Sequence, residues 1–149
     1  MKGTIIAVCR SEQTGTPKVP CGEGIFIEDF GMGDDAHAAQ GIARQVSLLS
    51  VESIAKMKSL GLELKPGDFA ENLTVEGMEL HCLPVGTRLR AGREVILEIS
   101  QIGKTCHAGC AIFKAVGACI MPKEGVFARV IRGGKISDGD PVEIIKEGA

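Results

Sequence analysis

Short runs of β-branched and aliphatic residues alternate along the chain with glycine-rich polar segments. Runs of this kind, bounded by Gly, Pro, Asn or Asp, are typical of β-strands. They predict strands at residues 2–9, 24–30, 45–49, 72–75, 78–83, 87–89, 95–100, 125–131 and 141–145. The intervening segments, above all 10–23 and 31–38, are rich in turn-forming residues and are predicted to be loops.

Residues 51–60 show helical rather than strand spacing. Apolar side chains recur there at Val51, Ile54, Met57 and Leu60. Ser50 is placed to cap the helix, and Gly61 is a natural stop. A second short helix is predicted over 111–116. Many short strands with one or two helices predict a mainly β, α+β domain with a barrel-like sheet.

Composition limits the classes of protein that this chain can belong to. Its 149 residues suit a single domain spanning 1–149. With 17 basic and 19 acidic residues, no Trp and no Tyr, it lacks both the positive charge and the aromatic platforms typical of nucleic-acid binding. No apolar run approaches the length of a membrane helix, and no leader peptide is visible. We therefore expect a cytoplasmic protein, with no membrane partner.

The chain has six cysteines: Cys9, Cys21, Cys82, Cys106, Cys110 and Cys119. Because cytoplasmic thiols are kept reduced, we interpret them as free thiols, metal ligands or catalysts rather than as disulfides.

The segment 101–110 carries the strongest candidate chemistry. It follows the predicted strand 95–100 and contains Cys106, with Lys104 and His107 beside it and Cys110 four residues on. Positive charge close to a thiol favours the thiolate, which is a nucleophile, a soft-metal ligand and a possible carrier of sulfane sulfur. We interpret Cys106 as the reactive thiol. Cys110 either resolves a persulfide or disulfide on Cys106 or packs beneath the next segment, and packing is the preferred interpretation.

Two other polar segments are ambiguous by themselves. Asp34, Asp35 and His37 form either a carboxylate–imidazole group or a solvated turn. The nearby pair Arg44-Gln45 could recognise an oxyanion, although arginine is more often a surface charge. In the segment 67–74, Glu71 and Asn72 either contact a ligand or stabilise the loop.

A zinc site is the weaker alternative for the thiols. Suitable ligand types are present at Cys106, His107, Cys110, Cys119 and the pair His81-Cys82. Their spacing matches no paired zinc motif. Phosphate-binding glycine loops and the G-x-S-x-G nucleophile motif are also missing from the sequence.

Four segments in order resemble the motifs of the MOSC domain family, named after the C-terminal domain of molybdenum-cofactor sulfurases. They are Gly33-Asp-Asp-Ala-His-Ala38, Arg44-Gln-Val-Ser-Leu-Leu-Ser50, Gly67-Asp-Phe-Ala-Glu-Asn-Leu-Thr74 and Gly103-Lys-Thr-Cys-His107. The form Cys106-His107-x-x-Cys110 is similar to small stand-alone bacterial members. The resemblance implies a mixed β-barrel with a few helices.

The resemblance also implies the site. The family position that binds molybdenum of the cofactor, or carries sulfur, corresponds to Cys106. It implies cofactor-binding roles for Asp35, His37, Arg44, Glu71, Asn72, Lys104 and His107. An extra acid precedes the Asp-Ala-His form, and Asp35 rather than Asp34 matches it. The cofactor is anionic through its phosphate and dithiolene, so Arg44, Lys104 or Arg129 could supply charge-assisted bonds.

Three hypotheses follow for the function. In the first, the protein binds molybdenum cofactor, or transfers sulfur to it, through Cys106. In the second, it is a non-catalytic docking partner of a cofactor-synthesis enzyme. In the third, it is a thiol- or zinc-based redox domain.

Overall fold

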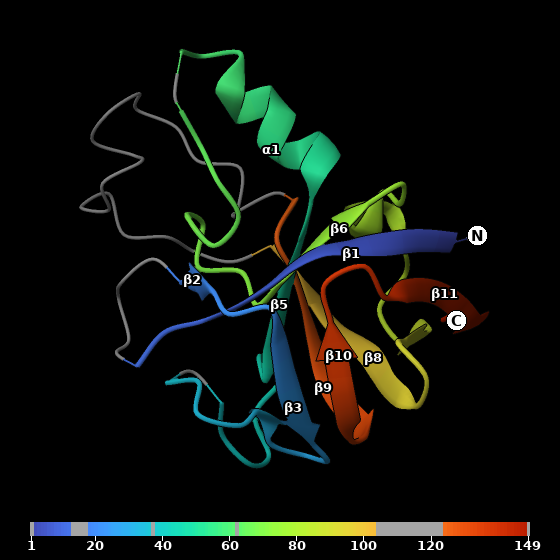
Figure 1. Cartoon of the computed structure of the whole chain (residues 1–149). Coiled ribbons are helices and arrows are strands. Elements are labelled where there is room, and N and C mark those ends of the chain that lie inside the picture. The colour runs from blue at the N-terminus through green and yellow to red at the C-terminus, as the bar shows by residue number, and fades with distance from the viewer. Residues whose placement is uncertain (1, 13–17, 37, 62, 104–123, 149) are drawn as a thin grey trace.

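Seven strands in the described part of the chain close into a mixed β-barrel (Figure 1). The computed structural model describes residues 2–12, 18–36, 38–61, 63–103 and 124–148. Around the barrel the order is β1 (Lys2–Arg10), β11 (Pro141–Lys146), β7 (Arg88–Ala91), β8 (Val95–Ile102), β9 (Val126–Arg132), β5 (Val46–Ser50) and β6 (Leu73–Glu76), which returns to β1. The β5–β6 pair is parallel, and the other barrel pairs are antiparallel. The predicted fold class is confirmed.

Alternation along each strand fills the barrel with aliphatic side chains. On β8, Val95, Leu97 and Ile99 are fully buried, while the residues between them face outward and are half-buried. β9 follows the same rule and points Val126, Ala128 and Val130 into the same core. Period-two burial is what a sheet with one inner and one outer face requires. The core is therefore mostly aliphatic, as the composition predicted, with Phe26 as its aromatic member among the described residues.

Smaller elements cover the outside and one end of the barrel. A second sheet has the order β10 (Gly134–Ser137), β3 (Glu23–Ile27), β4 (Gly31–Met32), and its strands β10 and β3 lie beside β8 and β9 in Figure 1. The two-residue strand β2 (Val19–Pro20) pairs with the end of β1. The helix α1 (Val51–Lys58) follows β5 directly.

The helix forms where the sequence predicted it. The Ser50 hydroxyl accepts a hydrogen bond from the Ser53 N–H at 3.1 Å, which caps the first turn. Ile54 and Met57 are buried against the barrel, and Gly61 follows with a positive φ of 93°. Among the described residues, no helix has the length and apolar character to cross a bilayer.

One predicted strand is wrong. Within 78–83 the structure has a 3-10 helix, η1 (Leu80–Cys82). Leu80 and Leu83 are both buried, and their spacing of three fits a 3-10 turn better than an alternating strand. The short strands β2, β4 and β10 were not predicted. The predicted helix at 111–116 lies outside the described residues.

Candidate functional site

Three loops meet beside the end of β1, and Lys18 is the residue that joins them. Its backbone N–H donates to the Gly67 carbonyl at 2.8 Å, and its ammonium reaches Asp35 in the 33–38 loop. Ser11 closes the third side, because its N–H donates to Asp35 Oδ1 at 3.0 Å. Gly67 is required here, since a Cβ would lie 2.2 Å from the Lys18 carbonyl oxygen and φ is 92°. The two loops that the sequence singled out thus share a neighbour.

The Lys18–Asp35 ion pair is shielded from solvent. The ammonium lies 2.8 Å from Oδ1 and 3.1 Å from Oδ2 of Asp35, and the two side chains are 1% and 0% exposed. Burial alone would raise the pKa of Asp35, but the hydrogen bonds from Lys18 and the Ser11 N–H outweigh it and lower the pKa. Asp35 is therefore an ionised carboxylate that fixes its own loop.

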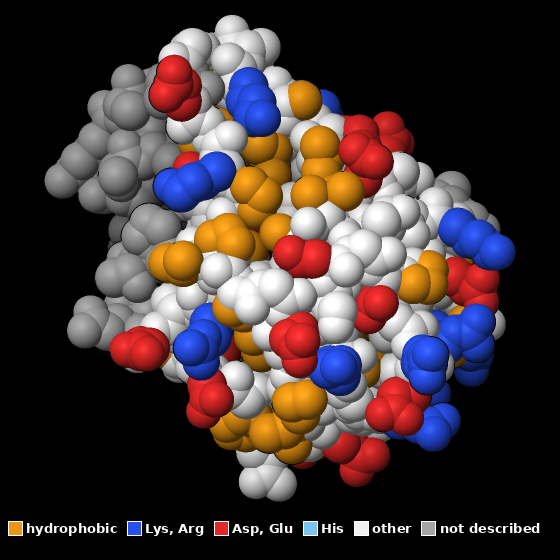
Figure 2. Space-filling view, in the orientation of Figure 1, with side chains coloured by type: hydrophobic (Ala, Val, Ile, Leu, Met, Phe, Trp, Pro, Cys, Tyr) orange, Lys and Arg blue, Asp and Glu red, His pale blue; other side chains and the backbone are white. Residues whose placement is uncertain are grey.

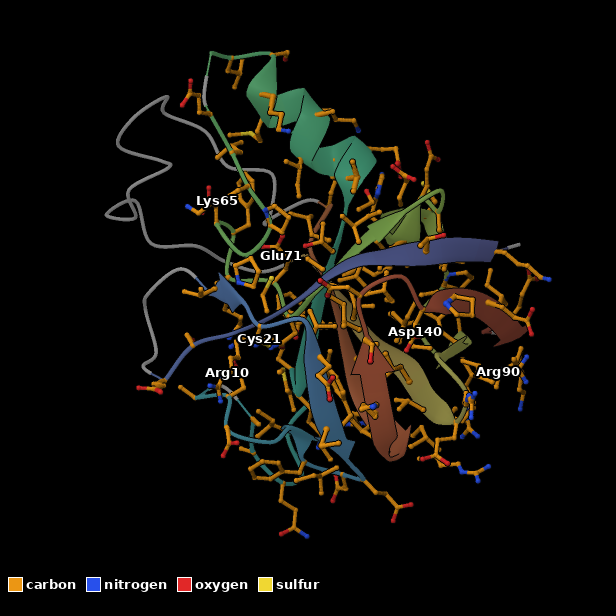
Figure 3. The ribbon with its side chains drawn as sticks, in the orientation of Figure 1. Arg10, Cys21, Lys65, Glu71, Arg90 and Asp140 are labelled. Atoms are coloured by element: carbon orange, nitrogen blue, oxygen red, sulfur yellow. The ribbon has the colours of Figure 1, made fainter. Side chains whose placement is uncertain are left out.

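Glu71 is buried in the adjacent loop and lies near the middle of the molecule in Figure 3, away from Arg90 at its edge. Its carboxylate accepts hydrogen bonds from the Phe69 N–H at 3.2 Å and the Thr74 hydroxyl at 2.8 Å. Burial raises the pKa of Glu71, against the lowering effect of these and other backbone hydrogen bonds. The Glu71 side chain thus folds back on its own loop and stabilises it, which is one of the two roles that the sequence left open.

Asn72 links that loop to the barrel wall. Its Oδ1 accepts from the Ser47 N–H at 3.0 Å, and its Nδ2 donates to the Cys9 carbonyl at 3.1 Å. Cys9, like Asn72, is buried, and burial together with the negative charge of Glu71 raises the pKa of its thiol to about 12. Cys9 is therefore a core residue and not a second nucleophile.

The pair Arg44-Gln45 divides between the surface and the interior. Gln45 is buried, donates to Asp29 Oδ1 at 2.9 Å and accepts from the Val130 N–H at 3.0 Å. Arg44 is exposed, with its guanidinium 5.7 Å from the centre of the Phe127 ring, a cation–π distance. Gln45 is therefore a structural residue, and Arg44 is the member of the pair that faces solvent.

Arg129 lies on the same face of β9 as Phe127 and is also exposed. Its Nε donates to the Ile42 carbonyl at 3.3 Å. Within the described ranges neither Arg44 nor Arg129 forms an ion pair. Two guanidinium groups that meet no carboxylate among the described residues thus border the outer face of β5 and β9.

The connection from β8 to β9 starts just beyond the pair Gln101–Phe127, where Arg44 covers the Phe127 ring, whereas Arg129 lies further along β9 opposite Glu98. The Gly103 N–H donates to the Gly125 carbonyl at 2.7 Å, so both ends of the connection lie together. Gln101 pairs with Phe127 in the β8–β9 ladder and donates from Nε2 to the Gly103 carbonyl at 2.8 Å. Lys104, Cys106, His107, Cys110 and Cys119 lie outside the described residues, as does His37.

Sequence reasoning missed Lys18. One lysine in a loop of polar residues is unremarkable, and its partner is 17 positions away on another loop. For metal binding, no group of three His, Cys, Asp or Glu side chains comes together in the described ranges. His81 and Cys82 lie within those ranges, whereas the other suggested zinc ligands do not.

The fold of this chain is similar to that of bacterial proteins of known structure. YuaD from Bacillus subtilis superposes with a TM-score of 0.79 at 17% identity, covering 97% of this chain and 96% of that one. YiiM from Geobacillus stearothermophilus superposes with a TM-score of 0.72 at 19% identity, covering 97% of this chain and 75% of that one. YiiM from Escherichia coli superposes with a TM-score of 0.67 at 21% identity, covering 100% of this chain and 72% of that one.

The MOSC domain matches residues 33–143, and the chain belongs to this family. The resemblance seen in the four sequence motifs is therefore confirmed. The family is associated with molybdenum cofactor sulfurase-like proteins, which links the chain to that cofactor. None of the curated proteins matches the sequence.

Proposed function

We propose that this protein binds molybdenum cofactor, or carries sulfur for its maturation, and that Cys106 is the thiol that does so. The observation that carries the proposal is that Arg44 and Arg129 are exposed and form no ion pair within the described residues, and that Arg44 lies over Phe127, which pairs with Gln101 two residues before Gly103. Cys106 follows Gly103 by three residues in the β8–β9 connection. An anionic ligand held by Arg44 would therefore lie near the residues from which that connection starts.

The donor set fits an anionic cofactor with a soft metal. Guanidinium groups bind phosphate oxygens with charge-assisted, often bidentate hydrogen bonds. When bound, the cofactor would supply a molybdenum ion with sulfur ligands, for which a thiolate is a suitable partner. In this proposal Lys104 and His107 favour the Cys106 thiolate, and His37 is a further cofactor-binding residue. Because that thiol must stay reduced, the proposal includes a cytoplasmic location.

Asp35, Glu71 and Asn72 act indirectly in this proposal. Each satisfies its hydrogen bonds within the protein, so each would hold a loop in position while the arginines and the thiol contact the ligand. On the face in Figure 2, basic and acidic side chains are interspersed, without a continuous basic surface. A small anionic ligand, or an enzyme of cofactor synthesis that presents it, suits this surface better than nucleic acid does.

The test is a binding measurement with molybdenum cofactor under anaerobic conditions. Wild type, Cys106→Ser, Arg44→Ala and Arg129→Ala are incubated with the cofactor, desalted, and assayed for bound molybdenum and zinc. We expect wild type to retain molybdenum, Cys106→Ser to lose it, and each arginine variant to bind at least about tenfold more weakly, the loss of roughly 1.4 kcal/mol. Arg93→Ala is the matched control, because this exposed arginine precedes β8 at its opposite end.

Two results would contradict this function. Equal molybdenum in wild type and Cys106→Ser would exclude a ligating thiolate. Binding of a cofactor-synthesis enzyme that needs neither cofactor nor Cys106 would favour the docking hypothesis, and stoichiometric zinc lost with Cys106 would favour the zinc domain.

A further inference from the structure

The 39–45 segment, which leads into β5, lies across the outer face of β8 and β9. On the β8 side, the Ser100 hydroxyl donates a hydrogen bond to the Ala43 carbonyl. On the β9 side, Arg129 Nε donates to the Ile42 carbonyl at 3.3 Å. Two successive carbonyls of the segment are therefore held by side chains of the barrel.

Asp29 holds the same segment from the turn between β3 and β4. Its Oδ1 accepts hydrogen bonds from the Gln45 side-chain amide at 2.9 Å and from the Gly41 N–H at 3.3 Å. The backbone N–H of Asp29 donates to the Val130 carbonyl at 2.9 Å, which fixes the turn on β9. One side-chain oxygen thus joins Gly41 to Gln45 across the segment.

The backbone at Asp29 restricts which residues can make these bonds. The Phe30 N–H donates to the Ile27 carbonyl at 3.0 Å, so Asp29 is the third residue of a four-residue turn. Its φ is 50°, in the left-handed region that Gly, Asn and Asp adopt most readily. Of these three residue types, Asp and Asn carry an acceptor oxygen on the side chain, and Gly does not.

We propose that Asp29 is a positioning residue for Arg44, because it fixes the 39–45 segment so that the guanidinium is held over the Phe127 ring before a ligand binds. The Arg44 side chain is exposed, and its place 5.7 Å from the ring centre depends on the backbone that carries it. Ordering a side chain on binding costs free energy, and a segment that is already fixed reduces that cost. The consequence for affinity rests on the proposed function, in which Arg44 holds an anion.

Two substitutions at Asp29 separate the hydrogen bonds from the charge. Asp29→Asn keeps an acceptor oxygen and Asp29→Gly removes it, while both remove the carboxylate and both accommodate the positive φ. NMR of the protein without ligand measures the side-chain protons of Arg44, which the Phe127 ring current shifts upfield. We expect this shift in wild type and in Asp29→Asn, and in Asp29→Gly we expect it to fall toward the value in Phe127→Leu.

Anaerobic titration with molybdenum cofactor measures the consequence for binding. We expect Asp29→Gly to raise the dissociation constant about threefold to tenfold, the range that ordering one side chain on binding accounts for, and Asp29→Asn to bind as wild type does. Wild-type Arg44 shifts in Asp29→Gly would overturn the inference. Equal losses of affinity in the two Asp29 variants would also overturn it, because the charge and not the hydrogen bonds would then be responsible.

Arg44→Ala distinguishes failure of this inference from failure of the proposed function. If Arg44→Ala binds the cofactor more weakly and Asp29→Gly binds it as wild type does, the positioning role is wrong and the proposed function stands. If Arg44→Ala itself binds as wild type does, Arg44 has no part in the proposed function. The NMR comparison of the two Asp29 variants then supports or overturns the positioning by itself.

Discussion

The Lys18 ammonium lies 2.8 Å from Asp35 Oδ1, and both side chains are excluded from water. The pair joins a loop that follows β1 to the loop that precedes β5, and the Lys18 N–H adds the loop before β6. Buried ion pairs have uncertain net value, but removing one partner leaves an uncompensated buried charge. The organisation of this side of the barrel therefore depends on both charges being present.

Removing either charge should be costly. We expect Lys18→Met and Asp35→Asn each to lower the free energy of unfolding by about 3–5 kcal/mol, because each leaves the other member of the pair as a buried ion without its counter-charge. The double variant should lose less than the sum of the two, and urea denaturation followed by circular dichroism measures this coupling. Lys65→Ala is the control, since its pair with Asp68 is exposed at the lysine and should contribute below about 1 kcal/mol. Additive single effects would contradict a direct Lys18–Asp35 interaction.

The two buried carboxyl groups, Asp35 and Glu71, should change the free energy of unfolding with pH in opposite directions. The pKa of Asp35 is lowered from 3.8, so its contribution is present above that value and is lost as pH falls through the folded-state pKa. The pKa of Glu71 is raised from 4.5, so its protonation contributes stability at acid pH that is lost as pH rises from 4.5 through the folded-state pKa.

Urea titrations from pH 7 to pH 3 test both signs. Relative to wild type, Glu71→Gln should gain less stability as pH falls from 7 toward 4.5, and Asp35→Asn should lose less as pH falls below 3.8. Glu76→Gln is the matched control, because Glu76 is exposed at the end of β6 and should leave the curve unchanged. A plot of unfolding free energy against pH for Glu71→Gln that runs parallel to that of wild type would show that burial does not raise the pKa of Glu71.

Local patterns predicted the regular elements well. The alternation in 95–100 and the Ser50 cap each depend on neighbours within a few residues, and both are as expected in β8 and α1. The failure at 78–83 has a local cause too. Leu80 and Leu83 face the core at a spacing of three, which a rule based on alternation cannot separate from an irregular strand.

The site was less predictable because its contacts cross loops. The sequence left Glu71 and Asn72 between ligand contact and loop support, and the structure gives both of them partners inside the protein. The link between the 33–38 and 67–74 loops runs through Lys18, which no spacing rule connects to either. The sequence left Arg44 between recognition of an oxyanion and a surface charge; the structure places it at the surface, and its position over Phe127 depends on β5 pairing with β9.

Solvent exposure and thiol pKa predict different reactivities for the cysteines. Cys9 is buried, and its pKa of about 12 leaves almost no thiolate near neutral pH. Cys82 is exposed, yet desolvation and the hydrogen bond to Glu79 raise its pKa as well. Alkylation of the native protein with iodoacetamide at pH 7.5, mapped by mass spectrometry, should label Cys9 on the order of a thousandfold more slowly than an ordinary thiol.

Cys82 should also react more slowly than its exposure suggests, and Glu79→Gln should accelerate it without changing Cys9, because the variant removes the negative charge beside the thiol. If the proposed function holds, Cys106 is labelled first, and Cys106→Ser removes that fastest phase. Labelling of Cys82 ahead of Cys106 would mean that Lys104 and His107 do not favour the Cys106 thiolate. Rapid labelling of Cys9 in the native state would instead show that the structure around Cys9, including its hydrogen bond with Asn72, opens readily.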